Sequence, residues 1–150
     1  MAFIATARAG DDEMAERILL HKKSRPKEWT TIEEPIDVAS AIVKALEYRV
    51  VIVDCLTLLL SNLMFENSRA NDADQILDAV SLLAKTSRDF EGTLIVVSNE
   101  VGMGIVPENE LAREFRDLAG RANQIMAGAA DEVYLCVSGI PIQIKGQVRD

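Results

Sequence analysis

The chain has 150 residues, 49% of them hydrophobic, and it carries a formal net charge of −8 with a pI near 4.7. This length and apolar content fit one domain with a substantial core, which excludes a disordered chain. The negative charge repels phosphate backbones and acidic lipids, which argues against general binding of nucleic acids or membrane surfaces. An anionic nucleotide would therefore have to be held by a local group of cations.

Hydrophobic periodicity predicts strands that alternate with helices along the chain. The expected strands are 2–5, 29–32, 50–53, 93–97, 132–137 and 140–145, and the expected helices are 11–22, 36–47, 56–66, 73–90 and 108–129. The runs 50–53 and 93–97 are continuously apolar, which is typical of strands covered on both faces. A polar loop from Asn67 to Asp72 separates two helices. The alternation predicts an α/β sandwich with a mostly parallel sheet, in a single domain over residues 1–150.

Two turn signals support these element boundaries, and two further observations bear on the location of the protein in the cell. Arg25-Pro26 ends the first helix, and Ser138-Gly139 turns the last two strands back on each other. The longest apolar stretch, 50–65, is interrupted by four polar residues, so no membrane span is expected. Cys55 and Cys136 lie in apolar runs without a secretory leader before them, which favours reduced, buried cysteines in a cytosolic protein.

Ligands of parallel α/β sheets collect at the carboxyl ends of the strands, where Thr6, Asp54, Asn99 and Glu100 would lie. The segment 98–109 that follows the strand 93–97 is a glycine-bearing polar loop. Such a loop buries little, so its polar groups are expected to face a ligand. The alternative is a tight turn at Gly102 and Gly104 that leads into a helix.

The only histidine, His21, lies at the end of the first helix beside Lys22, Lys23 and Arg25. A neutral imidazole can attack phosphorus, and neighbouring cations both lower its pKa and hold phosphate oxygens. The alternative is a surface histidine that interacts with the helix dipole. The basic residues form the densest cationic cluster in an acidic chain, although such runs are usually solvated.

Asp54 ends the apolar strand 50–53, which is the position of an acid that holds a magnesium ion or its water. The alternative is a strand-end cap for the following helix. Thr6, with its neighbours Ala5 and Ala7, follows the first strand. Its hydroxyl and the free amides there are suited either to a phosphate or base or to ordinary turn chemistry.

These motifs together resemble one family. The segments that carry the resemblance are 4–7 (IATA), 11–14 (DDEM), 17–18 (RI), 21–22 (HK), 25–26 (RP), Trp29, 98–109 (SNEVGMGIVPEN), 111–124 (LAREFRDLAGRANQ) and 137–140 (VSGI). They occur in order over nearly the whole chain, as in the bifunctional adenosylcobinamide kinase / adenosylcobinamide-phosphate guanylyltransferase family of cobalamin synthesis. The resemblance implies a RecA-like P-loop NTPase type of fold. The family's first strand and GxxxSGKS-type phosphate loop do not precede Met1.

The resemblance implies two reactions that use GTP (or ATP) and Mg²⁺: phosphorylation of adenosylcobinamide, and transfer of GMP from GTP to its phosphate, which gives adenosylcobinamide-GDP. His21 falls on the family's nucleophile, which forms a covalent GMP phosphoramidate. The implied nucleotide contacts are Ala5, Thr6, Ala7, Lys22, Lys23, Ser24, Arg25, Glu33 and Asp54, with Asp54 also at the metal. Lys23-Ser24 replaces a commoner Asp-Gly, and Asp54 replaces a commoner Glu.

The family also implies a homo-oligomer, a trimer being one such assembly, with a corrinoid substrate and a guanine nucleotide, whereas the net charge argues against a nucleic-acid partner. Without the phosphate loop, we expect the chain to be a truncated form of a longer transferase. Two alternatives remain if Met1 is authentic. One is a non-catalytic nucleotide- or corrinoid-binding remnant, and the other is a structural subunit completed by a strand from a partner chain.

Overall fold

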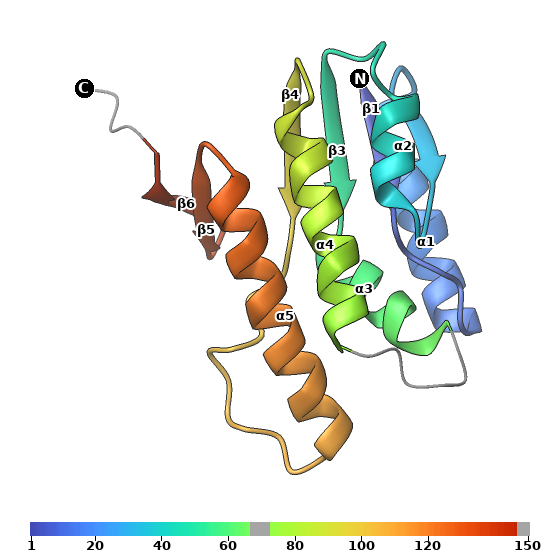
Figure 1. The fold of residues 1–150 in the computed structure, drawn as a ribbon. Coiled ribbons are helices and arrows are strands. Elements are labelled where there is room, and N and C mark those ends of the chain that lie inside the picture. The colour runs from blue at the N-terminus through green and yellow to red at the C-terminus, as the bar shows by residue number, and fades with distance from the viewer. Residues whose placement is uncertain (67–72, 147–150) are drawn as a thin grey trace.

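The computed structural model of the protein describes residues 1–66 and 73–146 and consists of alternating strands and helices (Figure 1). The elements are β1 (Ala2–Ala5), α1 (Asp12–Ser24), β2 (Thr30–Glu33), α2 (Val38–Lys44), β3 (Val50–Asp54), α3 (Leu56–Phe65), α4 (Ala73–Arg88), β4 (Thr93–Val97), α5 (Glu110–Ala129), β5 (Val133–Val137) and β6 (Ile140–Lys145). The predicted α/β class is confirmed. The predicted loop 67–72 lies outside the described residues.

Four strands form one parallel sheet in the order β2-β1-β3-β4. The chain moves outward from β1 to β2 and then back across the sheet to β3 and β4. Because crossovers between parallel strands are right-handed, α1 lies on the opposite face of the sheet from α2, α3 and α4. In Figure 1, α2 and α4 lie in front of the strands, and α5 lies beside α4. The face toward these helices is the core face, and the other is the α1 face.

The core lies between the sheet and the α2–α5 layer. It contains Ile4 from β1, Val51 and Val53 from β3, and Ile42 and Leu60 from the helices, all fully buried. By contrast, α1 buries none of its residues. The helices α1, α2 and α5 begin where a side chain satisfies a free amide: in α1 the carboxylate of Asp11 accepts from the Met14 amide at 2.7 Å.

The strand β4 corrects one prediction. Its residues alternate between half-buried and exposed, and Ile95 and Val97 on the α1 face are 44% and 40% exposed. The expectation of a strand covered on both faces is therefore wrong, because no described element packs on that side of β4. The prediction failed since a continuous apolar run reports what a strand could bury, whereas its neighbours decide what it does bury.

The strands β5 and β6 form a separate antiparallel hairpin beyond the end of α5 (Figure 1). Ser138 and Gly139 have φ values of 52° and 79°, the left-handed pair that a two-residue hairpin turn requires. Every residue of β6 is exposed. Cys136 is exposed too, so the prediction that it is buried is wrong, whereas Cys55 is buried and both thiols are free as expected.

The remaining differences concern element ends. The helix expected over 36–47 is only Val38–Lys44. Its cap is Asp37, whose carboxylate accepts from the Ser40 amide, so the chain before Asp37 cannot continue the helix. None of the helices in the described ranges combines the length and the apolar composition that a bilayer crossing requires.

Candidate functional site

The carboxyl ends of β1 and β3 are joined through Thr6. Its hydroxyl accepts from the Cys55 amide and donates to the Cys55 carbonyl, both at 2.8 Å, and its own amide donates to the Asp54 carbonyl at 3.1 Å. The Thr6 side chain is fully buried. In this structure the hydroxyl therefore fixes the Asp54–Cys55 backbone. The contact expected between Thr6 and a nucleotide stays a prediction.

A second set of hydrogen bonds extends this junction to β4. The side-chain amide of Asn99, just after β4, donates to the Thr57 hydroxyl at 2.8 Å, and that hydroxyl lies 3.2 Å from the Cys55 sulfur. Asn123 on α5 accepts from the Ser98 hydroxyl at 2.6 Å and donates to the Asn99 carbonyl at 3.3 Å. Side chains thus hold the ends of three adjacent strands together. This agrees with the prediction that the residues after these strands share the carboxyl edge of the sheet.

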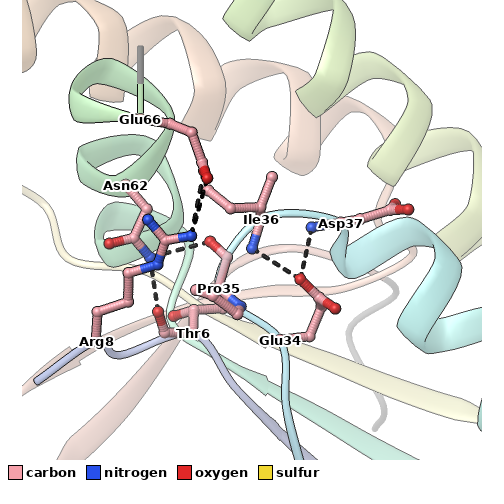
Figure 2. A network of polar contacts seen from close by, with 8 residues as sticks. All are labelled: Thr6, Arg8, Glu34, Pro35, Ile36, Asp37, Asn62 and Glu66. Carbon is pink, nitrogen blue, oxygen red and sulfur yellow. Dashed lines mark hydrogen bonds and ion pairs between the residues drawn. The ribbon is translucent and has the colours of Figure 1, made fainter. Parts of the chain in front are cut away.

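Asn62 on α3 holds the loops that leave β1 and β2 (Figure 2). Its amide nitrogen donates to the Thr6 carbonyl at 2.7 Å and to the Pro35 carbonyl at 3.0 Å. Both carbonyls lie just beyond the ends of their strands, where the ladder no longer supplies a donor. One half-buried amide therefore fixes two loops at the site edge.

Two further carboxylates hold the same loops (Figure 2). Glu34 accepts from the amides of Ile36 and Asp37 at 3.0 and 2.9 Å, which fixes the turn into α2. Glu66, at the end of α3, pairs with Arg8 at 3.1 Å. Because this pair is solvent-exposed, it contributes little stability, and its effect is to restrain the chain that leads into α1.

The end of α1 brings most of the predicted nucleotide contacts together. His21 and Lys22 lie in its last turn, and the Lys22 ammonium forms an ion pair with Glu33 at the end of β2. Ser24 donates to the His21 carbonyl at 2.9 Å, which caps the last turn. His21 and Lys23 are solvent-exposed. The Lys22–Glu33 pair therefore ties the helix that carries the histidine to the carboxyl edge of the sheet.

Arg25 follows directly and turns toward the α1 face of the sheet. Its guanidinium lies over the Phe3 ring, 3.8 Å from the centroid, and Nη1 donates to the Thr31 hydroxyl at 3.4 Å. Burial lowers the pKa of Arg25, and the negative charges of Asp54 and Glu33 oppose that shift. The guanidinium stays protonated at any physiological pH. Arg25 is thus a cation on which both acids of the predicted site act.

Asp54 and Glu33 end neighbouring strands on either side of β1 and share a register with Ala5. Residues in one register row have side chains on the same face, so both carboxylates belong to the α1 face. The described ranges contain no cluster of three histidine, cysteine or acidic residues that could form a cage for a metal ion. Mg²⁺ usually takes one or two protein carboxylates plus phosphates and water, so Asp54 fits as its single ligand.

The loop 98–109 is fixed mainly by its own residues and by α5. The Glu100 carboxylate accepts from the Gly102 amide at 2.7 Å, and a Cβ at Gly102 would meet that same oxygen. Arg116 donates to the Gly102 carbonyl. Asn109 caps α5 by accepting from the Ala112 amide at 3.0 Å. The Glu100 and Asn109 side chains are thus bound to nearby amides, whereas the Asn99 side chain is bound to Thr57 on α3, and a role of these residues in ligand binding stays a prediction.

Several contacts of this region had no signal assigned to them in the sequence. Asn62 and the two partners of Asn99, Thr57 and Asn123, hold the carboxyl edge together, and Phe3 stacks on Trp29, which precedes β2. Asn62 could have been found, since an amide inside the apolar run 56–65 needs a partner once that helix is buried. Phe3 could not, because nothing in its neighbours in sequence indicates a cation above its ring.

Comparison with known proteins identifies the family of this chain. The family model described as cobinamide kinase / cobinamide phosphate guanyltransferase matches residues 1–144. The bifunctional adenosylcobalamin biosynthesis protein CobU of Salmonella typhimurium is 43% identical over 153 residues, which cover 95% of this chain and 84% of that protein. CobU of Escherichia coli is 43% identical over 154 residues, again covering 95% and 84%. CobP of Pseudomonas aeruginosa is 38% identical over 148 residues, covering 98% and 83%. The chain belongs to the cobinamide kinase / cobinamide phosphate guanyltransferase family.

Proposed function

We propose that this chain transfers GMP from GTP to adenosylcobinamide phosphate through a covalent intermediate on His21. The observation that carries the proposal is the junction of α1 with the sheet. There the cations Lys22 and Arg25 lie one and four residues after the histidine, and Lys22 forms an ion pair with Glu33 at the end of β2. Phosphate oxygens need such local cations in a chain whose net charge is −8. Family membership supplies the reaction class.

In the first step, the unprotonated imidazole nitrogen of His21 attacks the α-phosphorus of GTP. A P–N bond forms while the bond from that phosphorus to the bridging oxygen breaks, and pyrophosphate leaves with the electron pair. The cations Lys22 and Arg25 offset the charge that develops on the leaving group. Bound Mg²⁺, held by Asp54, would supply further neutralisation of the phosphates.

In the second step, an oxygen of adenosylcobinamide phosphate attacks the same phosphorus. The P–N bond breaks, its electron pair returns to the imidazole, and adenosylcobinamide-GDP leaves. The Thr6–Cys55 and Asn62 hydrogen bonds hold the strand ends around this chemistry, so they contribute by positioning.

The second reaction of the family, phosphorylation of the corrinoid hydroxyl by GTP or ATP, is proposed on family membership alone. The 150 residues contain no G-x-x-x-x-G-K-[ST] segment to cradle the transferred phosphate. The cytosolic location and the homo-oligomeric assembly expected from the sequence stay predictions.

The proposal is tested by intact-protein mass spectrometry after incubation with GTP and Mg²⁺. We expect the wild-type chain to gain the mass of one GMP in an acid-labile form, and His21→Asn to gain nothing. Lys85→Ala, which removes an exposed cation on α4, is the matched control and should gain the mass as the wild type does. GTP binding without any mass gain would contradict the transfer reaction and leave a nucleotide-binding function.

A further inference from the structure

Two aromatic rings form a platform under Arg25. Phe3 and Trp29 stack with their ring centroids 6.4 Å apart and their planes at 22°. The Arg25 guanidinium carbon lies 3.8 Å from the Phe3 centroid, well inside the range of a cation–π interaction. The stack thus joins the first residues of β1, the end of α1 and the approach to β2.

The register of the sheet places this platform beside the acids of the site. Phe3 lies in one row with Thr31 and Ile52, and Ala5 lies in the next row of the same face with Glu33 and Asp54. Arg25 donates to Thr31 in the first row and is attracted by the two acids of the second. Its guanidinium therefore lies where the apolar part of the α1 face meets the acidic edge.

One atom of Arg25 lacks a partner. Its Nε is shielded from solvent and has no hydrogen-bond acceptor among residues 1–66 and 73–146. A buried donor without an acceptor costs free energy, which an incoming oxygen would recover. Phe3 contributes no acceptor, so it can fix the plane of the guanidinium and still leave that N–H available to a ligand.

We propose that Phe3 and Trp29 are positioning residues, which hold the Arg25 guanidinium so that its Nε–H donates to a phosphate oxygen of the bound nucleotide. The inference rests on the proposed function for the identity of the ligand. Phe3 and Trp29 act through Arg25 and need not touch the nucleotide. The competing explanation is that the two rings only fill space on the α1 face.

Equilibrium binding of GTP to Phe3→Leu, Arg25→Lys and the double variant separates these explanations. Leucine keeps an apolar side chain without the ring, so a space-filling role predicts unchanged affinity. We expect Phe3→Leu to weaken GTP binding about three- to tenfold. In the double variant the loss should be no greater than in Arg25→Lys alone, because the ring acts only through the guanidinium. Phe115→Leu, which alters a half-buried ring on the core side, should bind GTP as the wild type does.

Trp29 gives a second readout, since it is the only tryptophan of the chain. Its fluorescence should change when GTP binds to the wild type, and the change should shrink in Arg25→Lys. Unaltered GTP affinity in a folded Phe3→Leu, or losses that simply add in the double variant, would overturn the inference, as would a wild type that does not bind GTP. A wild type that binds GTP but forms no His21 adduct would contradict the transfer reaction alone, and the coupling between Phe3 and Arg25 would still be measured.

Discussion

The two halves of this molecule differ in how completely their apolar residues are covered. Around β1 and β3, the residues Ile4, Val51, Val53 and Leu60 are fully buried beneath α2 to α4. Around β4 and the β5–β6 hairpin, equally apolar residues such as Ile95, Ile142 and Ile144 are 44%, 49% and 64% exposed. The site residues lie mostly near β1, β2 and β3, although the side chains at the end of α1 and Glu33 are themselves exposed. A well-packed sheet edge holds polar groups in place, whereas the open half offers no comparable support.

Truncation of core residues should show the largest contrast between the halves. Leu60→Ala removes a fully buried side chain and should lower the free energy of unfolding by about 2–5 kcal/mol. Ile142→Ala removes a half-exposed one from β6 and should cost about 1 kcal/mol or less. Urea denaturation followed by circular dichroism measures both. Equal losses would mean that the hairpin is covered in solution, and the contrast between the halves would then not hold.

Exchange of an amide for an acid in each half should give the next largest contrast. In Asn62→Asp, a carboxylate faces the carbonyl oxygens of Thr6 and Pro35, which should cost about 3 kcal/mol at neutral pH. Asn123→Asp keeps the acceptor for Ser98 and loses only the 3.3 Å bond to Asn99, so it should cost less than about 1 kcal/mol.

The pH dependence of Asn62→Asp checks the cause of its cost. Carbonyl oxygens disfavour the charged carboxyl, so its folded pKa should lie above the unfolded value of about 3.9. The destabilisation is then full above the folded pKa and shrinks as the pH falls below it. Chemical denaturation at a series of pH values measures this. A loss of stability that is independent of pH would indicate a steric effect instead.

The helix caps should give the smallest contrast. Asp37 caps α2 in the covered half and Asn109 caps α5 in the open half, and each replacement by alanine should cost about 1 kcal/mol at neutral pH. Hydrogen bonds from Ser40 lower the pKa of Asp37 below its usual value. Its contribution is therefore present above the unfolded pKa of about 3.9 and is lost as the pH falls through the folded pKa.

Denaturation of the wild type and the two cap variants at neutral and at strongly acidic pH tests this difference. The difference in the free energy of unfolding between wild type and Asp37→Ala should become smaller in acid. The same difference for Asn109→Ala should not change, since an amide does not titrate there. If both differences behaved alike, Asp37 would not act through its charge.

Much of the fold was predictable because it depends on local patterns. The alternation of apolar strands with amphipathic helices gave the α/β class, and Ser138-Gly139 gave the hairpin, since both signals lie within a few residues. The edge position of Thr6, Asp54 and Asn99 followed from their places just after apolar runs. The burial of β4 and of Cys136 was predicted wrongly, because burial depends on elements that are distant in sequence.

The sequence by itself determined which residues end the strands, which helices they precede, and the family to which those motifs belong. Only the tertiary structure decided which side chains are partners: Asn62 with two carbonyls from different loops, and Arg25 with Phe3, 22 positions earlier in the chain. The physical reason is the separation in sequence between the interacting residues. Helix and strand patterns arise from neighbours in the chain, whereas a buried amide or guanidinium finds its partners only when distant segments pack together.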